Sequence, residues 1–451
     1  MEFVREEARD ARLVDRSDVV VVGGGPAGIA AAVSAARNGA SVTLVERYPY
    51  LGGLATGGMV LVLDDMSNGT EISVRGICFE MIERMQAWGL CVTPPDEDRQ
   101  LGVRDSAAIW RKWSRWGTYD FASRSFPHPV CFAAAFDPDA FKRASYDLVR
   151  ETGIKLRTHS WFSSAIVKDG AIAGVICETK EGRQAIMGGV VIDTTGDLDV
   201  AASAGARFQE SSYILTTVSR WGGVDTERAE AFEFENPERF AQLDHEAKRI
   251  IGGCWAYWWL KTPLPGIVWL NCPHIPKLHG LKVADLASVE LEGRRRIEEL
   301  LVFARKNMPG FENAFVVDFA PQTGVRQTRL LEGEYVVTKD DISLRRHFPD
   351  SVARGRDYYT PYRSMLPVEV DQLLVAGRHY SATAQAQKTS REIGPCMAMG
   401  EAAGVAAALA LNSGTTVRHA DVKAIQKQLR AQGSDPGDIP ADNAKIMVAA
   451  E

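Results

Sequence analysis

The sequence predicts an α/β protein in which a parallel sheet is assembled from separated segments, with a second domain of mixed α+β structure beside it. Three observations predict this class. A β-branched run at 18–23, an alanine-rich stretch at 26–38 and an apolar run at 41–46 form a strand–helix–strand unit, which builds parallel sheet. The pattern of a strand that runs into a glycine turn occurs again at 190–206 and at 371–383. The stretch between these two segments is aromatic and charged, and it contains no such turn.

The chain is long enough for two domains, since it has 451 residues. We expect the sheet domain to combine 18–75, 140–205 and 356–412, the cap or substrate domain to combine 76–139 and 206–355, and 413–451 to form a C-terminal extension. The patterns predict helices at 139–152 and 396–411 and strands at 154–167, 171–179 and 184–193.

Charge and composition narrow the function. With 58 acidic and 52 basic side chains the net charge is −6, and no basic stripe is present, so we expect no nucleic-acid partner. No apolar run approaches the length of a membrane span and the first residues are too charged for a signal peptide, so we expect no membrane association and a cytoplasmic location. The seven cysteines include no C-x-x-C pair, which predicts free thiols and no metal site.

The first glycine turn, GGGPAG, has the spacing of a dinucleotide-binding loop. Gly23, Gly25 and Gly28 satisfy G-x-G-x-x-G between a strand and a helix, where they allow a tight turn, close approach of a pyrophosphate, and close packing of helix on strand. Glu46 ends the next strand 18 residues after Gly28, where a carboxylate accepts hydrogen bonds from ribose hydroxyls. The pattern predicts a Rossmann-type domain.

A second glycine loop directly follows this unit, in RYPYLGGLATGG at 47–58. It offers more backbone to a pyrophosphate and a ribityl chain, which favours FAD over a nicotinamide cofactor. No second G-x-G-x-x-G follows a later strand, so the sequence does not identify the electron donor or acceptor.

The two loops together resemble the N-terminus of FAD-dependent oxidoreductases of the glutathione-reductase structural class, without the active-site cysteine pair of the disulfide reductases. VVIDTTGDLDVAASAGA, NMPGFENAF, TGVRQTRLLEGEYVVTKDDI, YYTPYRSMLPVEVDQLLVAGRHYSAT and SREIGPCMAMGEAAGVAAALA extend the resemblance over about 15–412 to a broad FAD-dependent oxidoreductase family, distantly similar to fumarate reductase flavoproteins. The resemblance implies FAD contacts at Gly23, Gly25, Pro26, Ala27, Gly28, Glu46, Arg47, Gly53 and Leu54.

The resemblance also implies contacts from two later segments. The turn containing Gly196 and Asp197 is expected on the adenosine side of FAD, although Asp197 could instead cap the following helix. Gly377 and Arg378 stand where many such enzymes have Gly-Asp; Arg378 is expected to meet the pyrophosphate, with outward packing as the alternative. His379 follows as either a structural or a catalytic histidine.

The helix that starts near Gly394 and Pro395 is expected to aim its N-terminus at the flavin, with Met397 and Ala398 (and Met399) as backbone contacts. We expect the FAD to be held non-covalently, although His379 and Cys396 are possible attachment points.

Substrate chemistry is expected from the later segments. Arg326 and Arg329, three residues apart, suit a carboxylate or an enolate, with salt bridges to Glu332 or Glu334 as the alternative. Trp255, Tyr257, Trp258 and Trp259 are expected to form either an aromatic wall for a flat substrate, or core or an oligomer interface.

These observations predict hydride transfer between a small organic substrate and FAD, in either direction. A flavin monooxygenase that uses NAD(P)H and oxygen is the alternative. A homo-oligomer is left open.

Overall fold

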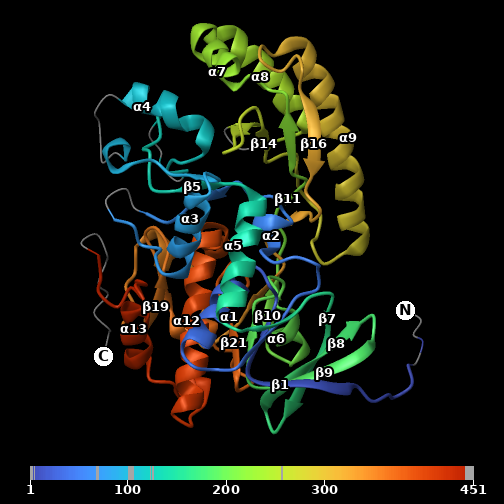
Figure 1. The fold of residues 1–451 in the computed structure, drawn as a ribbon, viewed down its shortest axis with the longest axis vertical. Coiled ribbons are helices and arrows are strands. Elements are labelled where there is room, and N and C mark those ends of the chain that lie inside the picture. Colours follow the sequence, from blue (N-terminus) through green and yellow to red (C-terminus); the bar gives the residue numbers. More distant parts are fainter. Residues whose placement is uncertain are drawn as a thin grey trace.

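The computed structural model describes residues 4, 6–67, 71–99, 106–121, 123, 126–254 and 257–441. Its main sheet has seven strands in the order β6-β2-β1-β9-β8-β7, with β21 also paired to β9 (Figure 1). The strands are β1 (Arg12–Val22), β2 (Val42–Val45), β6 (Lys155–Arg157), β7 (Trp161–Lys168), β8 (Ala171–Thr179), β9 (Gly182–Asp193) and β21 (Leu373–Val375). Strands β6, β2, β1, β9 and β21 pair in parallel, which confirms the predicted sheet and its assembly from separated segments. Strands β7, β8 and the first half of β9 add an antiparallel extension.

The sheet is covered on both faces, which explains why β1 ends in an unbroken run of valines. Val19 and Val21 belong to the core that contains α1 (Pro26–Arg37) and α12 (Ile393–Asn412). Val20 and Val22 belong to the opposite core, with residues of β8 and α6 (Asp199–Ser203). Side chains alternate between the faces of a strand, so a strand buried on both sides must be apolar throughout.

Helices α1 and α12 pack at unusually close range because of glycine. A Cβ on Gly400 would lie 2.0 Å from the Ala27 carbonyl oxygen, and one on Gly404 would lie 2.3 Å from that of Ala31. In the described part of the chain, α12 is the one helix long and apolar enough to cross a membrane, but 83% of its apolar window is buried inside the protein. Its composition is therefore that of a core helix.

The second lobe is of mixed α+β structure, as predicted, and lies at the far end of the molecule from β1 (Figure 1). One sheet has the order β13-β14-β12-β16 and another the order β15-β11-β17. The bounds are β11 (Leu215–Thr216), β12 (Ser219–Gly222), β13 (Leu260–Lys261), β14 (Val268–Leu270), β15 (His274–Ile275), β16 (Phe315–Phe319), β17 (Gly324–Val325), α7 (Thr226–Glu235), α8 (Pro237–Ile251) and α9 (Val283–Asn307).

The insertion after the second glycine loop does not stand apart from the sheet domain. Buried residues of α3 (Ile77–Ala87) share one hydrophobic core with α1, α12 and α5 (Pro138–Glu151). Strands β3 (Val62–Leu63), β5 (Ala134–Phe136) and β4 (Cys91–Val92) form a small sheet beside it. The domain boundaries proposed from the sequence stay a prediction.

The remaining elements connect these layers. They are α2 (Gly53–Thr56), α4 (Ser106–Trp113), β10 (Phe208–Glu210), β18 (Arg329–Leu331), α10 (Lys339–Ser343), β19 (Ser351–Arg354), β20 (Tyr359–Pro361), α11 (Ala384–Ser390) and α13 (Val422–Ala431). All seven cysteines are free, as predicted.

Candidate functional site

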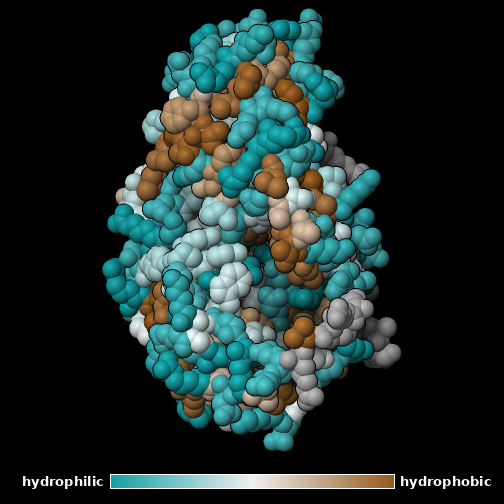
Figure 2. Space-filling view, turned by 90° about the vertical axis from the view of Figure 1, so that its right-hand side faces the viewer, coloured by the Kyte–Doolittle hydropathy of each residue, from teal (hydrophilic) through white to brown (hydrophobic). Residues whose placement is uncertain are grey.

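A cavity of about 1510 Å³ runs from the glycine turns of the sheet domain to the second lobe. Figure 2 shows the surface hollowed at mid-height, with apolar side chains beside the opening. Single-ligand pockets commonly measure about 300–1,000 Å³, so this cavity has room for two ligands. The predicted site residues that line it are Gly23, Gly25, Pro26, Ala27, Glu46, Arg47, Gly53, Leu54, Gly196, Asp197, Arg326, Arg329, Gly377, Arg378 and His379. Gly28, Met397 and Ala398 do not line it.

The first glycine turn has the geometry that its sequence predicts. Gly23 has a φ of +108°, and a Cβ there would lie 2.5 Å from the Thr194 carbonyl oxygen. Gly25 is the N-cap of α1 and Pro26 begins the helix, so the free N–H groups of the first turn open toward the cavity, as an anion requires. A Cβ on Gly28 would lie 1.8 Å from the Gly23 carbonyl oxygen, so its role is to allow close packing of helix on strand.

The second glycine loop lies directly against the first. Gly52 has a φ of +102°, which places Gly53 at the start of α2. A Cβ on Gly53 would lie 2.9 Å from the Gly25 Cα. The two loops therefore form one backbone cradle that side chains larger than glycine would fill.

Glu46 holds the first glycine turn and the residues just after β2 through backbone hydrogen bonds. One carboxylate oxygen accepts a hydrogen bond from the Gly24 N–H at 2.6 Å, and the other accepts one from the Tyr48 N–H at 2.9 Å. Burial raises the pKa of Glu46, although these two hydrogen bonds oppose the shift. The residue lines the cavity, and its contact with a ribose stays a prediction.

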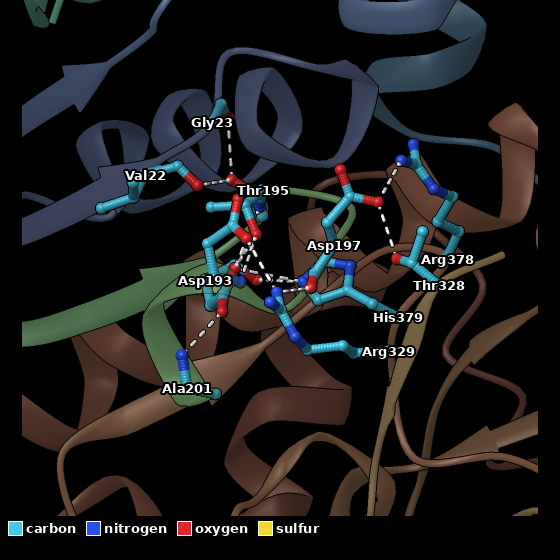
Figure 3. A network of polar contacts seen from close by, with 12 residues as sticks. Val22, Gly23, Asp193, Thr195, Asp197, Ala201, Thr328, Arg329, Arg378 and His379 are labelled. Carbon is cyan, nitrogen blue, oxygen red and sulfur yellow. Dashed lines mark hydrogen bonds and ion pairs between the residues drawn. The ribbon is translucent and has the colours of Figure 1, made fainter. Parts of the chain in front are cut away.

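The turn after β9 is held by a buried network around Asp193 (Figure 3). Its Oδ1 accepts hydrogen bonds from the Thr195 N–H and hydroxyl at 3.0 and 2.7 Å, and its Oδ2 accepts one from the Ala201 N–H at 2.9 Å. His379 Nε2 lies 3.2 Å from Asp193 Oδ1. Burial raises the pKa of Asp193, but the His379 ring and the hydrogen bonds outweigh it and lower the pKa below its ordinary value. The ring thus joins β9 to β21, and a catalytic role for it stays a prediction.

Asp197 binds Arg378 and Thr328 and does not cap the following helix. Its Oδ1 accepts a hydrogen bond from the Thr328 hydroxyl at 2.7 Å and lies 3.0 Å from a guanidinium nitrogen of Arg378 (Figure 3). The first turn of α6 is bound by Thr195 and Asp193 instead. Arg378 therefore lies against Asp197 at the cavity rather than packing outward, and its contact with a pyrophosphate stays a prediction.

The two predicted substrate arginines both line the cavity but have different partners. They lie in the segment that runs from β17 to β18, with Arg326 just after β17 and Arg329 at the start of β18. Arg329 donates to the Asp197 carbonyl and to Asp199 Oδ1, both at 3.0 Å, so its charge is compensated. Neither arginine pairs with Glu332 or Glu334 in the described residues, and Glu334 pairs with Arg418.

Arg326 is a half-buried cation whose hydrogen-bond partners are neutral groups. Its guanidinium contacts the Thr216 hydroxyl, Asn271 Oδ1 at 3.3 Å and His274 Nε2 at 3.5 Å. Among the described residues no carboxylate lies within ion-pair distance of it. Burial, together with the nearby Arg391 charge, lowers the pKa of Arg326 to about 9. Burial and the Arg326 charge lower the pKa of His274 to about 3, so the histidine is neutral.

The expected tryptophan wall is core instead. Trp258 and Trp259 are 0% and 1% exposed and pack with Phe311 beneath α8 and α9. Tyr257 lines the cavity, and Trp255 lies outside the described residues. Trp258 and Trp259 precede β13 in irregular backbone, so the sequence carries no strand or helix periodicity that would show which of these aromatic side chains face the core.

An aromatic wall does exist, but the insertion before β5 provides it. Tyr119, Phe121 and His128 line the cavity; the ring centroids of Tyr119 and Phe121 lie 4.3 Å apart, and those of Tyr119 and His128 5.4 Å apart. Sequence reasoning missed these residues, and the aromatic content of the insertion was the one signal for them.

Helix α12 reaches the cavity with its first turn. The helix begins at Ile393, three residues before the predicted start, so Ile393 and Cys396 line the cavity together with the preceding Arg391 and Glu392. Met397 is fully buried on the other side. Sequence reasoning also missed Asp64, Asp65, Asp120 and Arg356, which line the cavity near this turn.

The fold and the site define a dinucleotide-binding protein of the Rossmann type, in which one cavity extends from the nucleotide cradle to the second lobe. The sequence matches the family of FAD-dependent oxidoreductases over residues 18–359 and 354–429. The chain belongs to this family, and its cofactor is FAD. The glycine cradle, which a Cβ at Gly53 would obstruct, and the open N-terminus of α1 fit the pyrophosphate of that cofactor.

Similarity to individual proteins is weaker. Fumarate reductase (cytochrome) from Shewanella frigidimarina is 47% identical over 62 residues, which are 13% of this chain and 11% of that protein. Among solved structures, p-nitrophenol 4-monooxygenase from Pseudomonas putida DLL-E4 has 13% identity and a TM-score of 0.49, over 92% of this chain and 84% of that chain. L-proline dehydrogenase from P. horikoshii has 15% identity and a TM-score of 0.44, over 94% of this chain and all (100%) of that chain.

Proposed function

We propose that this FAD-dependent oxidoreductase transfers a hydride between non-covalently bound FAD and a small organic acid. The first glycine turn and the α1 N-terminus would hold the pyrophosphate, Glu46 the ribose, and the loop at Gly53 and Leu54 the ribityl chain. FAD, when bound, supplies the group that accepts or donates the hydride. The side chains of the protein bind, orient and exchange protons with the substrate.

Arg326 carries the proposal for the substrate. A cation partly withdrawn from water without a counter-ion is costly, and an anionic ligand offsets that cost. Arg326 lines the cavity beside strands of the second lobe, and Asn271 and Thr216 fix the orientation of its guanidinium. Arg329 and Arg378 already have carboxylate partners, so Arg326 is the arginine that suits a substrate carboxylate.

Non-covalent binding is supported by the state of Cys396. Burial raises the pKa of this thiol to about 12, and its Sγ donates to the Arg391 carbonyl oxygen at 3.3 Å. A thiol with a raised pKa is a poor nucleophile.

An anaerobic screen tests the function. Purified FAD-loaded protein is mixed with hydroxy acids, amino acids and aromatic acids, each beside its amide, and the loss of FAD absorbance is followed. We expect acids to reduce the FAD and their amides to react much more weakly. A requirement for NAD(P)H, with oxygen incorporated into the product, would support the hydroxylase in place of this proposal.

The Arg326→Gln variant tests whether Arg326 binds the carboxylate of the substrate. We expect it to weaken acid binding about 10- to 100-fold, because a hydrogen bond to a charged group contributes about 1.5–3 kcal/mol. Arg295→Gln, on the exposed face of α9, is the matched control. Equal acid affinity in Arg326→Gln and wild-type protein would contradict the assignment.

A further inference from the structure

Two adjacent carboxyl groups line the cavity directly after β3, and the contacts proposed for FAD do not use them. Asp64 and Asp65 both line the cavity. The Arg391–Glu392 pair, which precedes α12, is near enough to act electrostatically on Asp64 and also on Arg326. Asp64 and Arg326 therefore line the same cavity, and both lie within electrostatic range of this pair.

Asp65 is the member of the pair that has a cation beside it. Its Oδ1 lies 3.7 Å from Arg356 Nε, and the Tyr358 hydroxyl lies against it. The residue has a φ of +59°, a left-handed backbone conformation that side chains rarely adopt and that is concentrated at functional sites. Burial raises the pKa of Asp65 to about 7, although Arg356 opposes the shift.

Asp64 has the opposite environment. Among the described residues no cation lies within ion-pair distance of its carboxyl group. Burial, with the carboxylates of Glu392 and Asp65, raises its pKa well above the ordinary value, and Arg391 opposes this shift. Neighbouring carboxyl groups disfavour one another's ionisation, so Asp64 holds its proton more tightly than an isolated aspartate does. The charged and titratable groups around Asp64 are Asp65; Arg391 and Glu392 before α12; Arg356, Asp357 and Tyr358 after β19; and Tyr119, Asp120 and Cys131 before β5.

We propose that Asp64 is the side chain that exchanges a proton with the substrate, and that Asp65, held by Arg356, is a positioning residue that keeps the proton on Asp64. When the substrate is oxidised, its O–H or N–H bond breaks and the proton passes to the Asp64 carboxylate, while the hydride leaves to the FAD. In the reverse direction the Asp64 O–H bond breaks and the proton returns to the substrate. A general acid or base whose pKa lies near the working pH is the most effective. The inference deepens the proposed function and rests on it for the hydride.

Single-turnover kinetics test this proton exchange between Asp64 and the substrate. The substrate used is the acid that reduces the FAD fastest in the screen. We expect Asp64→Asn to slow FAD reduction about 10²- to 10⁴-fold and to remove the rise of the rate with pH, and Asp64→Glu to restore part of both. We expect Asp65→Asn to retain that rise but to shift it to lower pH, because a neighbouring negative charge is removed. Asp340→Asn, an exposed carboxylate of α10, is the control. A wild-type rate and pH profile in Asp64→Asn would overturn the proposal, provided that its FAD content equals that of the wild type.

Infrared spectroscopy tests whether Asp64 holds a proton, and it requires no substrate. At pH 7 the wild-type protein is expected to show the C=O stretch of a protonated carboxyl group that is missing from Asp64→Asn. Asp65→Asn and Glu401→Gln identify the contributions of two other carboxyl groups whose pKa values are about 7, Asp65 in the cavity and Glu401 outside its lining. If Asp64→Asn loses no band, the proposal is wrong even if the screen finds a substrate. If the band is lost but no compound reduces the FAD, the proposed function fails and the protonated Asp64 stands.

Discussion

At the scale of single residues, the function of a charged group depends on its partner. Arg329 and Arg378 are compensated by Asp199 and Asp197, whereas the described groups that contact the Arg326 guanidinium are neutral. Asp65 faces Arg356, whereas Asp64 faces other carboxylates. Chemically identical side chains therefore divide into those that fix the fold and those left available to a ligand.

Glu46 makes this distinction testable, because its carboxylate accepts hydrogen bonds from the loop backbone even before any ligand binds. Glu46→Ala leaves the buried Gly24 and Tyr48 N–H groups without their acceptor, at a cost of about 1–3 kcal/mol. We expect a lower unfolding temperature and at least tenfold weaker FAD retention, measured by FAD fluorescence after dilution. Glu299→Ala, on the exposed face of α9, is the control. Unchanged FAD retention would refute the role of Glu46.

At the scale of elements, the site depends on how closely helices and loops approach. Glycine at Gly28, Gly53 and Gly404 removes the side chain that would hold two backbones apart. The glycine spacing in the sequence predicted the first of these contacts. The approach of α12 to α1 was not predicted, because the two helices are separated by most of the chain.

Gly404→Ala tests the helix contact. Its Cβ would meet the Ala31 carbonyl oxygen at 2.3 Å and the Ala35 nitrogen at 2.8 Å, so α1 and α12 must separate. Overpacking of this kind costs about 1–3 kcal/mol. Because α1 begins at the glycine cradle, we expect both the free energy of unfolding and the FAD affinity to fall. Asn412→Ala, exposed at the end of the same helix, is the control and should change neither the free energy of unfolding nor the FAD affinity. Stability equal to wild type in Gly404→Ala would show that the two helices can separate at little cost.

At the scale of the whole molecule, α12 connects the layers. It packs on α1, on α3 and on the C-terminal helix α13, and its first turn reaches the cavity. Glu401, in its middle, accepts a hydrogen bond from the Ile77 N–H at the start of α3 at 3.0 Å. A buried carboxyl group thus joins the sheet domain to the insertion.

Glu401 gives the fold a pH dependence with a definite sign. Burial raises its pKa to about 7, above the ordinary value of 4.5. The protonated form therefore stabilises the folded state fully below about pH 4.5, and this contribution is lost as the pH rises through 7. We expect Glu401→Gln to gain stability relative to wild type as the pH rises from 5 to 8, by roughly 1–3 kcal/mol in urea unfolding. A difference independent of pH would contradict the shifted pKa.

The α/β class, the glycine cradle and the FAD cofactor could be predicted from the sequence, because they follow from local patterns: a strand, a glycine turn, a helix, an acidic residue at fixed spacing and a second glycine loop. The lining of the cavity is visible only in the folded chain. Folding gives Arg326 and Arg329 different partners, buries Trp258 and Trp259, and brings Asp64, Tyr119 and Arg356 to one cavity. The reason is that a chamber between two lobes is lined by residues from distant segments. Their charge and burial depend on partners that no local spacing specifies.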